Sequence, residues 1–130
     1  MNSANGSNGS TAGAKRVLVV EDELMIRMLL EDMLEQLGYT IAAEAGRIDE
    51  ALDAAKTGEF DLAILDVNLN GQTIGPVADA LVARGKPFVF STGYGEHGLP
   101  EAHRGRPTLK KPFHLEGLGT MLESALGGTS

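Results

Sequence analysis

Short apolar runs alternate along the chain with longer segments in which apolar residues recur at helical spacing. The runs are typical of strands buried on both faces, because they lack the alternation of a half-buried strand. We expect strands over 17–20, 39–43, 62–65, 88–90 and 108–110. Helices are expected over 24–37, from Ile48 to a stop at Gly58, from Val77 to a stop at Gly85, and over 115–126.

Strands that alternate with helices form a parallel sheet covered on both faces. The pattern therefore predicts an α/β fold with five strands and nominally five helices. The fourth helix is the exception, because four glycines and two prolines lie between Thr92 and Thr108. Relative to alanine, a helix interior loses roughly 1 kcal/mol per glycine and roughly 3 kcal/mol per proline. We expect one or two helical turns at most around 101–104, within a mobile loop.

The composition narrows the class of protein. A length of 130 residues suits one domain, and the absence of cysteine excludes disulfides, zinc-thiolate sites and thiol nucleophiles. A net charge of −7 argues against nucleic-acid binding. No apolar stretch approaches the roughly 20 residues that cross a bilayer, so no membrane segment is expected.

The chain is therefore expected to be cytoplasmic and, with no conspicuous exposed apolar stripe, monomeric. Residues 1–14 contain almost nothing to bury, and we expect a flexible tail or a remnant of the expression vector there. The folded domain is then expected over 15–130.

Polar side chains follow four of the five predicted strands. They are Glu21 and Asp22, Asp66, Ser91 and Thr92, and Lys111. The carboxyl ends of parallel strands meet at the edge where such sheets bind ligands. Carboxylates gathered there would raise one another's pKa, and a divalent cation such as Mg²⁺ would relieve that repulsion. A carboxylate nucleophile, a divalent cation and a lysine together suit the formation of an aspartyl phosphate.

Four segments in this order resemble the receiver domains of two-component response regulators. They are VLVVEDE (17–23), LAILDVNLNG (62–71), FSTG (90–93) and LKKPF (109–113). The resemblance covers the chain from Lys15 to about Leu126. It implies a flavodoxin-like, doubly wound (βα)5 fold with strand order 2-1-3-4-5, an order for which receiver domains are a known example.

The resemblance also implies a role for each residue at the strand ends. Asp66 is the expected phosphoacceptor, which takes its phosphoryl group from a phosphohistidine on a sensor histidine kinase. Thr92 is the expected switch hydroxyl, and Lys111 the partner of the phosphoryl group. The Lys111–Pro112 bond is expected to be cis, although cis is a minority state, about 5–6%, of such bonds in folded proteins.

The same resemblance implies a Mg²⁺ site, with Mn²⁺ as an alternative ion. Asp22 and Asp66 are the expected direct ligands, together with the backbone carbonyl of Asn68. Glu21 is the expected ligand through a water molecule. Asn70 stands where many receivers carry proline.

The stretch PFVFSTGYG (87–95) resembles a narrower group of receivers. This "FAT GUY" subgroup is named for a PFxFATGYG run and is associated with HWE-type histidine kinases. Thr108 occupies the place of the usual aromatic switch residue, and Tyr94 is a candidate to replace it. The expected switch region contains Ser91, Gly93, Tyr94 and Thr108, and extends through the fourth and fifth strands to the last helix.

Two other functions fit the sequence less well. An aspartyl phosphatase would need a second carboxylate two residues after Asp66, where the chain has Asn68. A receiver-like binding module without phosphorylation would not need the full set of site residues. We therefore expect a phosphorylatable, single-domain signalling module rather than an enzyme, acting by binding a downstream protein or as a phosphate sink.

Methionines and histidines at other positions are expected to have structural roles. Met25, Met28 and Met33 lie at helical spacing and are expected in the core. His97, His103 and His114 lack metal-ligand spacing and are expected at the surface.

Overall fold

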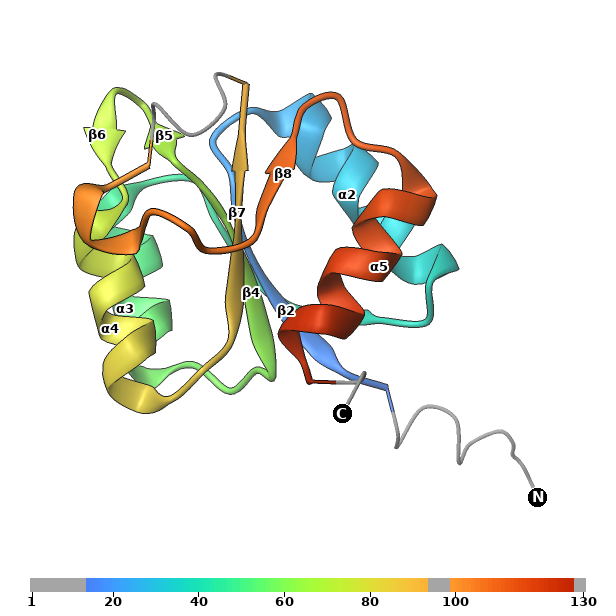
Figure 1. The fold of residues 1–130 in the computed structure, drawn as a ribbon, viewed down its shortest axis with the longest axis horizontal. Helices are drawn as coiled ribbons and strands as arrows, with labels where there is room; N and C mark the ends of the chain where they lie inside the picture. The colour runs from blue at the N-terminus through green and yellow to red at the C-terminus, as the bar shows by residue number, and fades with distance from the viewer. Residues whose placement is uncertain (1–13, 94–98, 128–130) are drawn as a thin grey trace.

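The computed structural model describes residues 14–93 and 99–127 and contains a central parallel sheet (Figure 1). Its strands are β2 (Arg16–Val20), β3 (Thr40–Ala45), β4 (Leu62–Asp66), β7 (Phe88–Thr92) and β8 (Thr108–Lys110). They lie side by side in the order β3-β2-β4-β7-β8, and each neighbouring pair is parallel. This is the 2-1-3-4-5 order, so the expected flavodoxin-like fold is confirmed.

Within the described residues, four α-helices cover the two faces of the sheet. They are α2 (Leu24–Gln36), α3 (Ile48–Thr57), α4 (Gly75–Arg84) and α5 (Leu115–Ala125). Figure 1 shows α3 and α4 on one side of the sheet and α2 and α5 on the other. Among the described residues, no helix is both long and apolar enough to span a membrane.

The sheet separates two apolar cores, which explains the uninterrupted apolar runs of the sequence. Successive side chains of a strand point to opposite faces. On β2, Val17 and Val19 join the core beneath α2 and α5, while Leu18 and Val20 join the core beneath α3 and α4. All four are at most 1% exposed, so neither face of the strand has room for a polar residue.

A small hairpin follows β4 where the sequence had indicated only a turn. Strand β5 (Asn68–Leu69) pairs antiparallel with β6 (Gln72–Thr73). The two residues between them, Asn70 and Gly71, have φ angles of 54° and 78°. Positive φ at both positions is the mark of a type I′ turn, for which Asn-Gly is a favoured pair.

In the described part of the segment between β7 and β8, residues 99–107, the one helical element is a 3₁₀ turn, η2 (Glu101–His103). The expectation of one or two turns at most is confirmed for this turn. The predicted mobile loop includes residues 94–98, which lie outside the described residues. Residues 1–13 of the predicted tail and residues 128–130 also lie outside them.

His103 is buried, so its expected place at the surface is wrong. Its Nε2 lies 2.8 Å from Oδ1 of Asp79 on α4, and its Nδ1 accepts a hydrogen bond of 3.2 Å from Nε of Arg106. The imidazole also meets the rings of Phe88 and Phe90 edge to face, each at a centroid distance of 6.1 Å. This one side chain therefore joins the η2 segment to both α4 and the sheet.

Helix α2 exposes several apolar side chains that periodicity had placed in the core. Met25 is 83% exposed and Met28 is 56% exposed, so their predicted burial is wrong. Met33 is partly buried and packs against the core, as expected. Leu24 and Leu29 are also exposed, so the chain does carry an apolar surface on α2, contrary to expectation.

Candidate functional site

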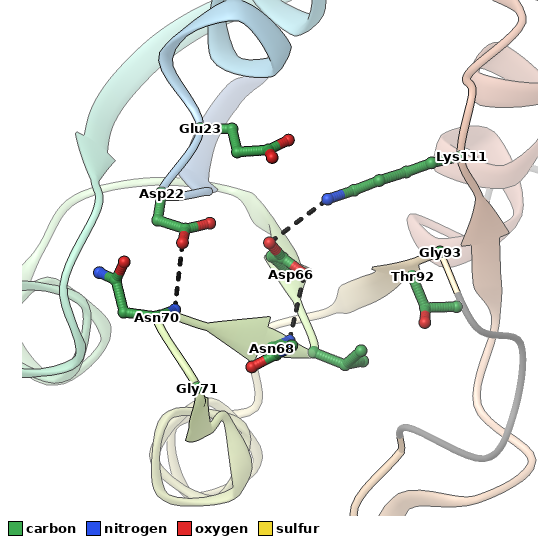
Figure 2. A pocket seen from close by; sticks show the side chains of 10 residues that line it. Asp22, Glu23, Asp66, Asn68, Asn70, Gly71, Thr92, Gly93 and Lys111 are labelled. Carbon is green, nitrogen blue, oxygen red and sulfur yellow. Dashed lines mark hydrogen bonds and ion pairs between the residues drawn. The ribbon is translucent and has the colours of Figure 1, made fainter.

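A pocket of about 380 Å³ opens at the carboxyl edge of the sheet (Figure 2). The loops that follow β2, β4, β7 and β8 supply its walls. Its lining residues are Asp22, Glu23, Asp66, Val67, Asn68, Asn70, Gly71, Thr92, Gly93 and Lys111. Residues distant in the sequence therefore meet here because their strands end at the same edge.

Three carboxylates form the acidic part of the site. One oxygen from each of Glu21, Asp22 and Asp66 lies within 4.8 Å of the others. Glu21 and Asp66 are buried, whereas Asp22 is half-buried and faces the pocket. Closely spaced carboxylate oxygens are the donors that Mg²⁺ and Mn²⁺ prefer, so the donor set fits a hard divalent cation.

Lys111 brings a positive charge to these carboxylates. Its Nζ lies 3.0 Å from Oε1 of Glu21 and 3.3 Å from Oδ2 of Asp66. Because β7 lies between β8 and β4, the lysine side chain must reach past the end of β7 to make these contacts. Figure 2 shows the ammonium group directed at Asp66. The peptide bond between Lys111 and Pro112 is cis.

Burial and pairing oppose each other in setting the charges of this cluster. Burial raises the pKa of Glu21 from 4.5 to about 7, although the Glu23 N–H and Lys111 pull it down. Burial also raises the pKa of Asp66, against the Asn68 N–H and Lys111. Burial lowers the pKa of Lys111, but its contacts with the two carboxylates outweigh this and leave it above the ordinary value. Added positive charge would therefore stabilise the ionised carboxylates.

Backbone N–H groups hold all three carboxylates. The N–H of Asn68 donates to Oδ1 of Asp66 at 3.1 Å, and the N–H of Glu23 donates to Oε2 of Glu21 at 3.0 Å. The N–H of Asn70 donates to Oδ2 of Asp22 at 3.1 Å. The carboxylates are thus oriented by the turns that follow β2 and β4.

The residues of the expected switch region lie at different distances from the pocket. Thr92 is fully buried, and both Thr92 and Gly93 line the pocket. Ser91 is 1% exposed, and its Oγ has no hydrogen-bond partner among the described residues. Thr108 is half-buried and donates from its hydroxyl to the carbonyl of Arg106 at 3.0 Å. Tyr94 lies outside the described residues.

Sequence reasoning had given no role in the site to Asn70 or Glu23, which both line the pocket. Glu23 is the N-cap residue of α2, and its side chain makes no capping hydrogen bond. Asn70 could have been suspected from the Asn-Gly pair, which favours a tight hairpin that returns to the sheet edge. Its contact with Asp22, which lies 48 positions earlier in the chain, leaves no local signal.

Comparisons with known proteins agree with this geometry. The family model "Response regulator receiver domain" matches residues 17–123. The chain is 34% identical over 124 residues to the transcriptional regulatory protein PdtaR of Mycobacterium tuberculosis, with 92% of this chain covered. It spans only 60% of the length of PdtaR.

Solved structures give a similar result. SdrG from Sphingomonas melonis Fr1 superposes with a TM-score of 0.77 at 44% identity, covering 87% of this chain and 96% of SdrG. The BeF3-activated conformation of SdrG from Pseudomonas melonis Fr1 gives a TM-score of 0.73 at 42% identity, with coverages of 88% and 98%.

The receiver domain of PhyR from Erythrobacter litoralis superposes with a TM-score of 0.78 at 32% identity, covering 89% of this chain and 92% of that domain. The matched family includes the phosphorylatable modules of two-component signalling, which bind Mg²⁺ through acidic residues. The family model covers most of the chain, and the strand order and the acidic cluster agree with it. The chain therefore belongs to the response regulator receiver domain family.

Proposed function

We propose that this receiver takes a phosphoryl group from a sensor histidine kinase onto Asp66, in a reaction that depends on Mg²⁺. The observation that carries the proposal is the environment of the Asp66 carboxylate. It lines an open pocket, lies 3.3 Å from the Lys111 ammonium, and shares an oxygen cluster with Glu21 and Asp22. The Asp66 carboxylate thus borders the pocket beside an ammonium group that can pair with a phosphoryl oxygen and two carboxylates that can hold a cation.

The proposed transfer is an in-line displacement at phosphorus. An oxygen of the Asp66 carboxylate forms a bond to phosphorus while the phosphorus–nitrogen bond of the kinase phosphohistidine breaks, and the histidine leaves with the electron pair. The Asn68 N–H fixes Oδ1 of Asp66, so the acceptor group has one orientation in the pocket. Lys111 then pairs with a phosphoryl oxygen, and the Thr92 hydroxyl donates to another.

The proposed cation ligands are Asp22, Asp66 and the backbone carbonyl of Asn68, with Glu21 acting through a water molecule. A bound Mg²⁺ would neutralise charge that develops on the phosphoryl oxygens. Glu21 is held by the Glu23 N–H and by Lys111, which suits a ligand that stays behind a water molecule. Mn²⁺ prefers the same oxygen donors and is the proposed alternative ion.

The proposed response to phosphorylation involves the segment from β7 to α5. A phosphoryl group on Asp66 carries about −1.5 to −2 charges in place of the single charge of the carboxylate, and would draw Thr92 and Lys111 toward it. Thr92 is the last residue of β7 and Lys111 directly follows β8. The two are joined by a backbone hydrogen bond of 3.0 Å, in which the Lys111 N–H donates to the carbonyl of Thr92. Movement at the site would thus pass to Gly93, which follows β7, and to Thr108 at the start of β8, both of which belong to the proposed switch region.

We also propose that the chain belongs to the "FAT GUY" group and is served by an HWE-type kinase. The PFVFSTGYG run at 87–95 and the threonine at position 108 support this assignment. The exposed apolar surface of α2 supports a protein partner beside the pocket. Leu24 and Met25 directly follow the pocket residues Asp22 and Glu23, and Met28 lies one helical turn further along α2. Contiguous exposed apolar residues of this kind mark protein contact surfaces.

The test uses a small phosphodonor, phosphoramidate, so that no kinase needs to be known. With Mg²⁺ present, mass spectrometry should show the addition of one phosphoryl group to the wild-type chain. Asp66→Asn is the matched control, because the amide keeps the size of the side chain and loses the nucleophile. Beryllofluoride with Mg²⁺ should shift the amide resonances of residues 91–93 and 108–111 in wild type alone.

Two results would contradict the proposal. Uptake of phosphoryl that persists in Asp66→Asn would place the acceptor elsewhere. Uptake that is absent in wild type, with no change of amide resonances on adding Mg²⁺ and beryllofluoride, would identify a binding module that keeps the fold without phosphorylation.

A further inference from the structure

Asn70 connects three loops at the edge of the candidate site. Its N–H donates to Oδ2 of Asp22, and its side-chain amide donates to the carbonyl of Gly46 at 3.0 Å. Asp22 follows β2, Gly46 follows β3, and Asn70 forms the tip of the hairpin that follows β4. Figure 2 shows Asp22 directed at the backbone nitrogen of Asn70, on the opposite side of the pocket from Lys111.

The backbone conformation of Asn70 makes both contacts available. Its φ of 54° lies in the left-handed region, which asparagine tolerates better than most residues. Many receivers carry proline at the corresponding position, and proline has neither an N–H nor access to positive φ. The contact between Asn70 and Asp22 is thus a departure of this chain from the pattern that it otherwise resembles.

The contact has a direct consequence for the carboxylate of Asp22. With Oδ2 held by the Asn70 N–H, the carboxylate of Asp22 is restricted in rotation, and its other oxygen makes no contact with Asn70. The same hairpin carries Asn68, whose N–H holds Asp66. Anchoring the hairpin to Gly46 therefore fixes the position of the Asp22 carboxylate relative to that of Asp66.

We propose that Asn70 is a positioning residue of the cation site, which presets the carboxylate of Asp22 and the hairpin that carries Asn68. The inference rests on the proposed function, because it assumes that Asp22 is a cation ligand. Groups that orient metal ligands from outside contribute typically 10–100-fold to metal affinity. The cation would therefore bind a site that is already arranged before it arrives.

The first test measures the Kd for Mg²⁺ by calorimetry in wild type and Asn70→Gly. Glycine tolerates the positive φ and keeps the N–H, so this change removes the tether to Gly46 without straining the turn. We expect the Kd to rise about tenfold. Gln72→Ala is the matched control, since Gln72 is an exposed residue of the same hairpin, and its Kd should equal that of wild type.

The second test needs no metal. Amide hydrogen exchange at Asn70 should be slow in the metal-free wild type and faster in Asp22→Ala, because the acceptor of that N–H is lost. The ¹³C resonance of the Asp22 carboxylate should also shift in metal-free Asn70→Gly, while the urea midpoint of that variant stays within the range of the Gln72→Ala control.

The outcomes separate this inference from the proposed function. A wild type that binds Mg²⁺, with an unchanged Kd in Asn70→Gly, would overturn the role of the Asn70 side chain and its tether to Gly46, and would leave the proposed function intact. Exchange at Asn70 that does not respond to Asp22→Ala would overturn the role of its N–H in holding Asp22. A wild type that does not bind Mg²⁺ at all would contradict the proposed function itself.

Discussion

The side chain of His103 offers a quantitative test of how the segment between β7 and β8 is held. Because Nε–H of Arg106 donates to Nδ1, the imidazole carries its proton on Nε2 and donates it to Asp79. The Asp79 side chain is 72% exposed, so this bond contributes only about 1 kcal/mol. Each of the two edge-to-face contacts, with Phe88 and Phe90, contributes about 0.5–1.5 kcal/mol.

His103→Ala removes all of these contacts and should destabilise the segment by about 3 kcal/mol. His103→Phe keeps an aromatic ring and loses the two polar contacts, whose partners Asp79 and Arg106 are exposed enough to bind water instead. This variant should lose about 1 kcal/mol. The difference of about 2 kcal/mol between the two variants measures the ring packing.

The assay is amide hydrogen exchange, read at the N–H groups of His103 and Arg106, alongside urea unfolding. Those two N–H groups donate to the carbonyls of Pro100 and His103, at 2.9 Å and 3.3 Å, within the segment itself. If the segment opens while the rest of the domain stays folded, the full loss of stability appears in the hydrogen exchange of these two N–H groups. The loss in the free energy of unfolding measured with urea is then smaller. If hydrogen exchange gives His103→Ala and His103→Phe the same free energy of opening, within about 0.5 kcal/mol, the idea that ring contacts hold the segment is refuted.

Three further changes probe the charges of the site and the surface of α2. Lys111→Met leaves Asp66 and Glu21 buried without their ammonium partner. In urea titrations at pH 8, the free energy of unfolding should fall by about 3 kcal/mol. An unchanged value would mean that the ion pairs do not stabilise the fold. Burial raises the pKa of Glu21 to about 7 in the folded chain, against 4.5 ordinarily, so the folded state favours the protonated carboxyl. The stabilisation of the fold by this protonation is complete below pH 4.5. It is lost as the pH rises to about 7, by at most about 3 kcal/mol. Unfolding of the metal-free protein at several pH values should show this fall in wild type and a flatter profile in Glu21→Gln, and an equal slope in both would place its source elsewhere. Met25→Gln should change the free energy of unfolding by less than about 0.5 kcal/mol, because the side chain is 83% exposed. The same variant should take up phosphoryl from the kinase more slowly than wild type, and from phosphoramidate at the same rate.

Local sequence patterns predicted the sheet because burial on both faces leaves a strong trace. Val17 to Val20 and Leu62 to Leu65 face two cores at once, so each run is apolar throughout. The order of the strands was not contained in these runs and came from the resemblance. The residues at the strand ends were found because a parallel sheet gathers its carboxyl ends at one edge.

The errors occurred where a residue's environment depends on distant parts of the chain. Helical spacing places Met25 and Met28 on helix α2 but does not say how much of the helix surface the sheet covers, and Leu30 and Leu34 occupy the buried side. His103 looked like a loop histidine because its partner Asp79 stands 24 positions earlier. Contacts of this kind become visible only in three dimensions.

The distribution of the site over separate strands has a consequence for the folding chain. Asp22 follows β2, Asp66 is the last residue of β4, and Lys111 follows β8, so their side chains meet only after these strands have come together in the sheet. A nascent or partly unfolded copy has the same residues but no assembled acceptor. If Asp66 is the phosphoacceptor, as proposed, only copies with a complete sheet would be able to take up a phosphoryl group.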